Sequence, residues 1–347
     1  MNILAIDTSA DDTSCAIISG RKVLAHVEYS QIALHAKWGG ILPSLAKRAH
    51  EERIDWVIQK TLRNAHLSLA QIHGIGVTYG PGLAIALEVG IRKAVELSST
   101  LTIPLIPVNH MEGHLYSSFV QNAKGNPTRP FQFPYLGLLV SGGHTELILF
   151  KDHLTYEILG QTVDDAAGEA LDKAARMLGF GYPGGPVIET LSQTVKHEDR
   201  YIFPRPMMKS QDLQFSFSGL KTALLYKIQK MSEEEKIEAL PYLASSFQEA
   251  VMKSLIKKTE RAILKTGISR LVVGGGVSVN ERLRTLLRAL VKSHGGIVQF
   301  PPYKYLNFDN SAMIGIVASF RAEEGLMLSP GSHIDRVPRL SLLQSTQ

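Results

Sequence analysis

Cysteine is almost absent from this chain. Cys15 is the single thiol among 347 residues, which excludes an internal disulfide and any zinc site built from several thiolates. A metal ion bound by side chains of this chain would therefore have to be held by histidine and carboxylate groups.

Long apolar runs are missing as well. The longest, such as LTIPLIPV and YLGLLV, are interrupted or bounded by Pro or Gly, and they fall well below the roughly 20 residues that a membrane-spanning helix needs. The first residues, MNILAID, have the pattern of a strand and lack the features of a secretion signal or an organelle leader. We therefore expect no association with a membrane and a cytoplasmic location.

The composition indicates a folded chain without a strong charge imbalance. Hydrophobic residues make up 44% and charged residues 20%, which is enough apolar material to fill a core. The net charge of +5 suits a polyanionic partner such as nucleic acid, although many other enzymes are equally basic. The length of the chain predicts two lobes of ordinary domain size.

Hydrophobic periodicity predicts the same order of elements twice. The first hundred residues alternate as three strands, a helix, a strand and a helix, over 3–7, 14–19, 22–26, about 42–65, 74–78 and 84–98. After Pro134, LGLLVSGGHTELILF parallels ILAIDTSADDTSCAIIS, and VVGGGVSVNERLR parallels GVTYGPGLAIALEVGIR. We interpret this pattern as an internal duplication.

Two βββαβα halves with glycine-rich turns are typical of the actin-like ATPase (ASKHA) fold. By analogy with that fold, we expect an α/β protein of two RNase H-like lobes, with a nucleotide in a central cleft. The expected first lobe comprises residues 1–134 and 308–330, the second comprises 135–307, and 331–347 form a C-terminal tail.

Four glycine-rich turns occupy corresponding places in the two halves. Ser141, Gly142 and Gly143 form one turn, GPG and YPGGP form two others, and GGG from Gly274 precedes a predicted helix. Such turns let a phosphate approach backbone N–H groups, although a glycine in a single turn often does no more than close a hairpin. Neither a Walker-type motif nor a spaced GxGxxG occurs.

The string NHMEGH contains a candidate metal site. His110 and His114 are four residues apart, so on a helix both imidazoles share one face. Glu112 does not share that face, unlike the base of an HExxH protease, and we expect it to reach back to the helix start at Asn109. Asp309, just before the last predicted helix, is the candidate third ligand, with a helix N-cap as its alternative role. This donor set favours iron(II), and zinc would also accept it.

Nine motifs in chain order resemble those of the bacterial tRNA N6-adenosine threonylcarbamoyltransferases, the TsaD family. They are IDTSADDT, YSQ, GPGL, PVNHMEGH, LLVSGGHTEL, DDAAGEALDKAARMLGFGYPGGP, FSFSGLKTA, GGGVSVN and FDNSAMI. The resemblance implies transfer of a threonylcarbamoyl group from threonylcarbamoyl-AMP to N6 of the adenine next to the anticodon, in tRNAs that read codons beginning with adenine. Three positions depart from the family pattern, since Ala10 and Asp12 stand where Cys and Glu are common and Glu189 stands where many members have Asp.

The resemblance also implies site residues and partners. It makes His110, His114 and Asp309 the ligands of one Fe2+ per subunit. It implies that the donor or another adenine nucleotide is bound by Leu139, Val140, Ser141, Gly142, Gly143, Asp172, Gly185 and Asn280. The implied partners are tRNA, a separate synthase that supplies threonylcarbamoyl-AMP, the smaller TsaB paralogue and the TsaE ATPase.

Three other functions remain open at the level of sequence. A metalloprotease would need a base that Glu112 is misplaced to supply. A sugar or acetate kinase of the actin-like class would share the glycine turns but would not require His110 and His114. A non-catalytic scaffold would leave the ligand set unexplained.

Overall fold

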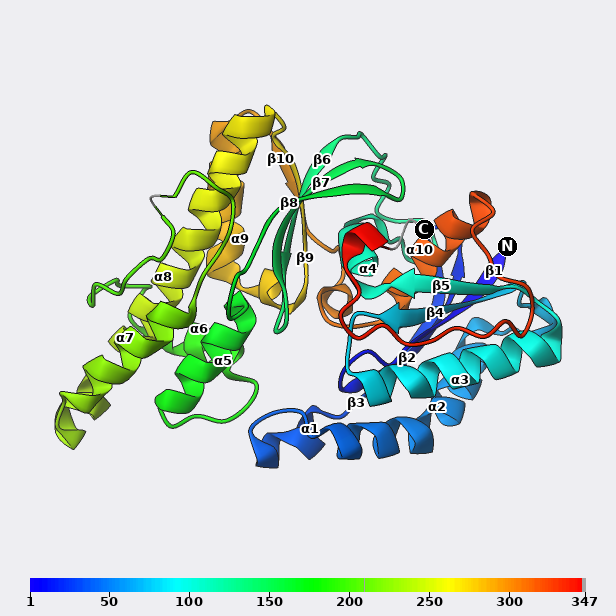
Figure 1. Cartoon of the computed structure of the whole chain (residues 1–347), viewed down its shortest axis with the longest axis horizontal. Helices are drawn as coiled ribbons and strands as arrows, with labels where there is room; N and C mark the ends of the chain where they lie inside the picture. Colours follow the sequence, from blue (N-terminus) through cyan, green and yellow to red (C-terminus); the bar gives the residue numbers. More distant parts are fainter. Residues whose placement is uncertain (209, 345–347) are drawn as a thin grey trace. The chain divides into compact units, whose positions relative to one another are not determined.

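The structure, a computed structural model, describes residues 1–208 and 210–344. It divides into two compact units (Figure 1). Unit 1 contains residues 1–133, 151–156 and those from 300 onward, and unit 2 contains residues 134–150 and 157–299.

Unit 1 is built on a five-stranded sheet in the order β3-β2-β1-β4-β5. Its strands are β1 Asn2–Asp7, β2 Asp12–Ser19, β3 Lys22–Ser30, β4 Gly74–Gly80 and β5 Leu105–Asn109. Its helices are α1 Ile32–His35, α2 Pro43–Ala65, α3 Ala84–Leu101, α4 His110–Tyr116 and α10 Ser311–Glu323, with short 3-10 turns η1 Ala36–Trp38, η2 Leu69–Gln71, η3 Ser117–Phe119, η5 Lys304–Asn307 and η6 Leu342–Gln344. The first three strands are antiparallel, and β1, β4 and β5 are parallel.

Successive side chains of β1 point to opposite faces of the sheet and are apolar on both, which explains why helices cover both faces. Leu4 and Ile6 belong to the apolar cluster that α2 and α3 complete. Ile3 and Ala5 point to the opposite face, where Gly315 of α10 approaches Ala5 so closely that a Cβ there would lie 3.2 Å from the Cβ of Ala5. The strand is therefore buried on both sides, with α2 and α3 along one side and α10 along the other (Figure 1).

Unit 2 repeats the order of unit 1. Its sheet runs β10-β9-β6-β7-β8, in which β6, β7, β8, β9 and β10 take the places of β1, β2, β3, β4 and β5. Its elements are β6 Tyr135–Val140, β7 Thr145–Asp152, β8 Thr155–Gln161, α5 Ala167–Met177, α6 Gly184–Thr194, α7 Ser218–Gln229, α8 Glu233–Thr266, β9 Arg270–Gly274, η4 Gly276–Val279, α9 Glu281–Ser293 and β10 Ile297–Gln299. The predicted duplication is confirmed.

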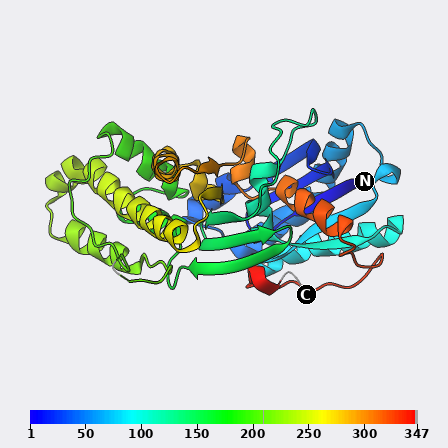
Figure 2. The same cartoon turned by 90° about the horizontal axis from the view of Figure 1, so that it is seen from above.

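The long helix α8 has clear start and stop signals. Ser232 and Glu235 form a capping box at its start. The negative charges of Glu233 and Glu234 lie in the first turn, where they interact favourably with the positive end of the helix dipole. Gly267 ends it in a left-handed conformation, with φ of 71°. Figure 2 shows this helix lengthwise, in yellow-green, within unit 2.

The described part of the C-terminal segment packs on unit 1. The Val337 N–H donates to the Tyr79 carbonyl at 2.8 Å, and Leu340 and Leu342 are buried. Gly80 must be glycine for this packing, because a Cβ there would lie 2.1 Å from the Val337 carbonyl oxygen. The glycine of the GPG motif therefore has a packing role.

None of the helices in the described part of the chain combines the length and apolar character that crossing a bilayer requires.

Candidate functional site

Two histidines share one face of α4 at the end of β5. The Asn109 side chain caps this helix by accepting the N–H of Met111 at 2.8 Å. His110 and His114 follow one turn apart, both buried, with their ring centroids 4.8 Å apart. The prediction that the NHMEGH string places both imidazoles on one helical face is confirmed.

Asp309 meets these histidines although it lies about 200 residues away in the sequence. Its Oδ1 is 3.2 Å from His110 Nε2 and 3.3 Å from His114 Nε2. The cap of α10 is Asn310, whose side chain accepts the N–H of Met313 at 3.0 Å, so Asp309 is not that cap. One ligand atom from each of the three residues lies within 4.8 Å of the other two, which makes this cluster a candidate metal site.

The buried nitrogens of this cluster fit a cation. His110 Nδ1 and both ring nitrogens of His114 are buried and make no hydrogen bond within the described residues. A buried polar atom without a partner is costly, and a cation coordinated beside Asp309 would supply one for His114 Nε2, which lies 3.3 Å from the Asp309 carboxylate. Two imidazole nitrogens and one carboxylate oxygen are donors that iron(II) and zinc both accept.

Three further aspartates, which sequence reasoning did not assign to the site, surround the cluster. Asp7 ends β1, with its Oδ2 3.7 Å from His110 Nδ1. Burial raises the pKa of all three aspartates. The pKa of Asp11 rises to about 6, because repulsion from Asp309 adds to the effect of burial. The pKa of Asp12 rises to about 8. Burial alone would also raise the pKa of Asp309, but His110 and His114 hold it well below its ordinary value. The signal was present in IDTSADDT, where three carboxylates follow closely at the end of a strand.

Glu112 has a different role from the predicted one. Its carboxylate lies 3.2 Å from the Arg321 guanidinium of α10, and both side chains are buried. This ion pair joins the histidine helix α4 to the helix that follows Asp309. Glu112 therefore helps to hold the two helices of the cluster in place.

In unit 2, the predicted glycine turn follows β6. Leu139 and Val140 are the last two residues of β6, and both are buried. In the turn, Ser141 Oγ accepts the N–H of Gly143 at 3.3 Å and the N–H of the residue after Gly143 at 3.1 Å. A Cβ on Gly142 or Gly143 would meet nothing within 4 Å. The turn is closed by Ser141, and its two glycines face open space.

The glycine turn before α9 packs against this first turn. Gly275 has φ of 90°, and a Cβ there would lie 2.4 Å from the Val140 carbonyl oxygen. Gly168, at the start of α5, approaches Ser141 in the same way, since its Cβ would lie 2.5 Å from the Ser141 carbonyl oxygen. The fold therefore brings together two predicted turns and a helix N-terminus, an arrangement suited to an anion.

The other predicted nucleotide contacts also cap helices. Asp172 Oδ1 accepts the N–H groups of Gly184 and Gly185 at 2.7 and 3.1 Å, which holds the start of α6. Asn280 caps α9 by accepting the Leu283 N–H at 2.9 Å. Glu189, which is not one of the predicted contacts, accepts the N–H of the residue after Asn280 at 2.7 Å. Each of these side chains has a structural role, whatever else it binds.

Sequence reasoning missed Glu146 on β7, a half-buried residue whose Oε2 is buried. It lies opposite Leu139 in the register of the sheet, and its Oε2 makes no hydrogen bond within the described residues. Burial raises its pKa to about 7. Because the unfolded chain releases this proton near pH 4.5, the protonated carboxyl stabilises the fold fully below that pH, and this stabilisation is lost as the pH rises through about 7.

We expect Glu146→Gln to stabilise the protein at pH 8 by as much as about 3 kcal/mol and to have little effect near pH 4.5. Glutamine has no charge to bury, so the difference between variant and wild type should grow between these two pH values. Urea unfolding at both pH values measures it, with the exposed Glu238→Gln as the matched control. An equal effect at both pH values would contradict the ionisation argument.

Comparisons with known proteins give the family. Residues 22–316 match the family model described as TsaD, tRNA N6-adenosine threonylcarbamoyltransferase. A protein of that name from Thermosipho africanus is 44% identical over 342 residues, covering 99% of this chain and 100% of the relative. Another, from Trichlorobacter lovleyi, is 45% identical over 317 residues, covering 91% of this chain and 90% of the relative.

Solved structures support the predicted fold class. HypF from T. kodakarensis matches with a TM-score of 0.62 at 14% identity, over 93% of this chain and 48% of that protein. The activator of 2-hydroxyisocaproyl-CoA dehydratase from Clostridium difficile matches with a TM-score of 0.51 at 13% identity, over 94% of this chain and 97% of that protein. At these identities the likeness shows the fold alone, which is the α/β actin-like class with two mixed sheets. The family match, by contrast, extends to function: this chain belongs to the tRNA N6-adenosine threonylcarbamoyltransferases and is a transferase that modifies adenosine in tRNA.

Proposed function

We propose that this chain transfers the threonylcarbamoyl group of threonylcarbamoyl-AMP to N6 of the adenine next to the anticodon, in tRNAs that read codons beginning with adenine, and releases AMP. We further propose that His110, His114 and Asp309 hold the metal ion of this reaction, with iron(II) as the physiological metal. The observation that carries the proposal is the convergence of the buried His110 and His114 with the half-buried Asp309, which brings one ligand atom of each residue within 4.8 Å of the other two. An ion bound there would supply positive charge that favours charge development on the donor during acyl transfer.

The proposed reaction forms one bond and breaks another. The N6 amine attacks the carbonyl carbon of the donor, the bond from that carbon to the phosphate oxygen breaks, and AMP leaves with the electron pair. The N6 nitrogen gives up one proton to the surrounding water. Because AMP is a good leaving group, the main tasks of the protein are to bind both substrates and to orient them. Asp7, Asp11 and Asp12 are buried near the cluster, where burial raises their pKa values, and a cation bound there would favour their charged forms.

The glycine turns of unit 2 are the proposed binding place for the donor phosphate and ribose. Gly142 and Gly143 expose backbone, and the start of α5 adds a helix N-terminus. Asp172 uses Oδ1 for the start of α6, so we propose that Oδ2 accepts a ribose hydroxyl. Leu139, Val140, Ser141, Gly185 and Asn280 complete the proposed nucleotide site.

The other proposed partners are the threonylcarbamoyl-AMP synthase, the TsaB paralogue and the TsaE ATPase, with the cytoplasm as the location. The net charge of +5 favours a polyanionic partner. On α2, Arg48 pairs with Glu52 at 3.0 Å while its side chain stays 78% exposed. A weak exposed pair of this kind does not prevent contact with phosphate.

We expect metal-loaded wild-type protein, given threonylcarbamoyl-AMP, tRNA and the partner proteins, to form the modified adenosine and AMP in equal amounts. Nucleoside analysis of digested tRNA measures the first product and chromatography the second. Small-molecule phosphorylation from ATP by metal-free protein would favour the kinase alternative, and peptide release would favour the protease. Failure to modify tRNA under these conditions would remove the proposal.

A further inference from the structure

The chain between β3 and α2 exposes several large apolar side chains. This stretch, residues 31–42, contains α1 and η1, and we name it the β3–α2 segment. Its exposed apolar residues are Ile32, Leu34, Trp38 and Leu42, and Trp38 is 66% exposed. Single exposed apolar residues are normal on a protein surface, whereas several together commonly mark an interaction site. Figure 1 shows the segment in blue, leading into α2.

Buried hydrogen bonds fix both ends of the β3–α2 segment. At its start, the Gln31 backbone N–H donates to the Asp11 carbonyl at 2.9 Å. The His35 side chain accepts the Leu42 N–H at 3.2 Å, and its Nε2 lies 3.1 Å from the Gln31 side-chain oxygen. The Gln31 amide nitrogen in turn lies 3.3 Å from His50 Nδ1. The exposed residues between the two ends are therefore presented by a braced segment.

The same network ties the segment to the turn between β1 and β2. His50 Nε2 lies 3.1 Å from the Ala10 carbonyl oxygen, and its Nδ1 lies 2.8 Å from the Thr13 hydroxyl. Burial lowers the pKa of His50 to about 4, so near pH 7 its ring is neutral and makes these bonds without a charge. The turn follows Asp7, whose carboxylate lies 3.7 Å from His110 Nδ1. Hydrogen bonds therefore connect the segment with the turn that borders the candidate metal site.

The segment and the start of α2 are basic. Between residues 31 and 50 the chain carries Lys37, Lys47 and Arg48 and neither Asp nor Glu. Lys37, which directly precedes Trp38, is exposed. The first turn of α2 has no acidic residue, so the positive end of its helix dipole adds to this charge. Such a surface attracts the phosphate groups of a nucleic acid.

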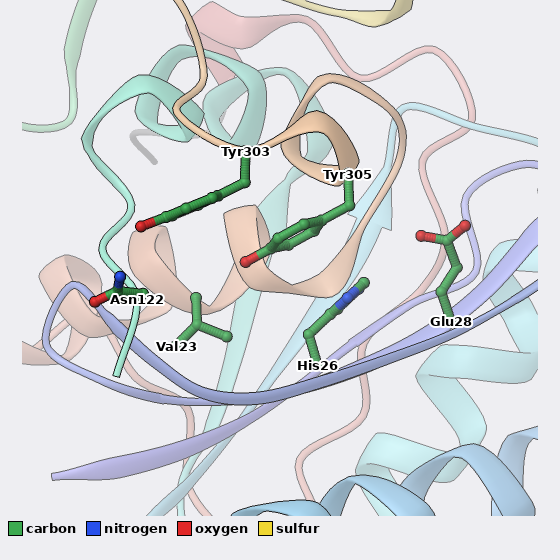
Figure 3. A pocket seen from close by; sticks show the side chains of 6 residues that line it. All are labelled: Val23, His26, Glu28, Asn122, Tyr303 and Tyr305. Carbon is green, nitrogen blue, oxygen red and sulfur yellow. The ribbon is translucent and has the colours of Figure 1, made fainter. Parts of the chain in front are cut away.

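A second aromatic surface of unit 1 is less suited to a nucleic acid. It is a pocket of about 500 Å³, and Figure 3 shows Tyr303 and Tyr305 on one side of it and residues of β3 on the other. The Tyr305 ring already stacks on His26, with the ring centroids 4.8 Å apart. The exposed Glu28 also lines this pocket, and its carboxylate repels phosphate. The β3–α2 segment is therefore the better match.

We propose that Trp38 stacks on an unpaired base of the tRNA substrate, while Lys37, Lys47 and Arg48 bind its phosphates. This inference rests on the proposed function, and it adds a tRNA-binding surface to it. Proteins commonly bind unpaired RNA by combining basic side chains with aromatic side chains on which bases stack. An exposed tryptophan beside a lysine, on a braced segment, provides both. A partner protein is the other occupant that an exposed apolar segment can have, so the experiment must separate the two.

Binding and kinetics with Trp38 variants test the assignment. We expect Trp38→Ala to raise both the Kd and the KM for tRNA about tenfold, since loss of one base stack has an effect on this scale. Trp38→Tyr keeps an aromatic ring and should stay within about twofold of the wild type. The KM for threonylcarbamoyl-AMP should not change in either variant. Trp56→Ala removes the other tryptophan of the chain, which lies on α2, and this matched control should bind tRNA as the wild type does.

Tryptophan fluorescence reports the stacking without turnover. In Trp56→Phe, Trp38 is the only tryptophan, and we expect its emission to be quenched when metal-loaded protein is titrated with an anticodon stem-loop. Adding Lys37→Met should weaken this binding and reduce its dependence on salt concentration, because one phosphate contact is lost. Binding of the stem-loop without quenching would overturn the assignment.

Two further results would also contradict the proposal. If the wild type modifies tRNA but Trp38→Ala has an unchanged Kd and KM for tRNA, the surface assignment fails and the proposed function stands. If Trp38→Ala binds tRNA normally but loses a partner protein in analytical ultracentrifugation, the segment is a protein interface and the assignment is wrong.

Discussion

Asp309→Asn is expected to release the bound metal and to lower the rate of transfer at least about a hundredfold. The carboxylate is the one anionic ligand of the proposed set, and its oxygen lies within 3.3 Å of both histidine nitrogens. Loss of a residue that only supports a metal ligand commonly costs about 10–100-fold, so loss of a direct ligand should cost no less. Metal content by mass spectrometry and initial rates of tRNA modification measure the two effects.

The control for this variant is a carboxylate of the same type outside the site. Asp335 is 78% exposed at its side chain, and Asp335→Asn should keep both metal and activity. Near-UV circular dichroism checks that Asp309→Asn remains folded. Full metal occupancy in Asp309→Asn would show that the ion is held elsewhere, and the proposed metal site would then be wrong.

Arg321→Met is expected to destabilise the protein by about 3–5 kcal/mol. Arg321 and Glu112 are 7% and 0% exposed, so the variant leaves the carboxylate buried without its cation, and breaking such a pair costs energy on this scale. Urea unfolding measures the loss. Since the pair joins α4 to α10, metal affinity should fall in the same variant.

A double variant separates the buried charge from the lost packing. Glu112→Gln combined with Arg321→Met leaves no buried charge, so it should be more stable than Arg321→Met alone. The exposed pair of Arg48 and Glu52 offers a matched comparison, and Arg48→Met should change stability by less than about 1 kcal/mol. Equal losses for the single and the double variant would mean that the cost comes from packing.

The buried ion pair has a consequence for the metal site. A metal site needs its ligands held in place before the ion arrives, and here the ligands come from two segments that meet only in the fold. The pair of Glu112 and Arg321 connects the helix of His110 and His114 with the helix that begins after Asp309. The stability prediction and the metal prediction are therefore physically linked.

The sequence by itself determined the features that depend on neighbouring residues. The shared face of His110 and His114 follows from their spacing on a helix, and the two sheets follow from strand periodicity that occurs twice. The order of motifs also placed the chain in its family. Each of these features depends on the local conformation of the backbone, which residues close together in the sequence determine.

The tertiary structure alone decided which distant side chains meet. Local spacing suggested that Glu112 would cap its own helix, but its carboxylate pairs with Arg321, 209 residues away. The same holds for Glu146, because no motif indicated that its Oε2 would be buried. Such contacts depend on how sheets and helices pack, and residue spacing carries no information about packing between segments far apart in the chain.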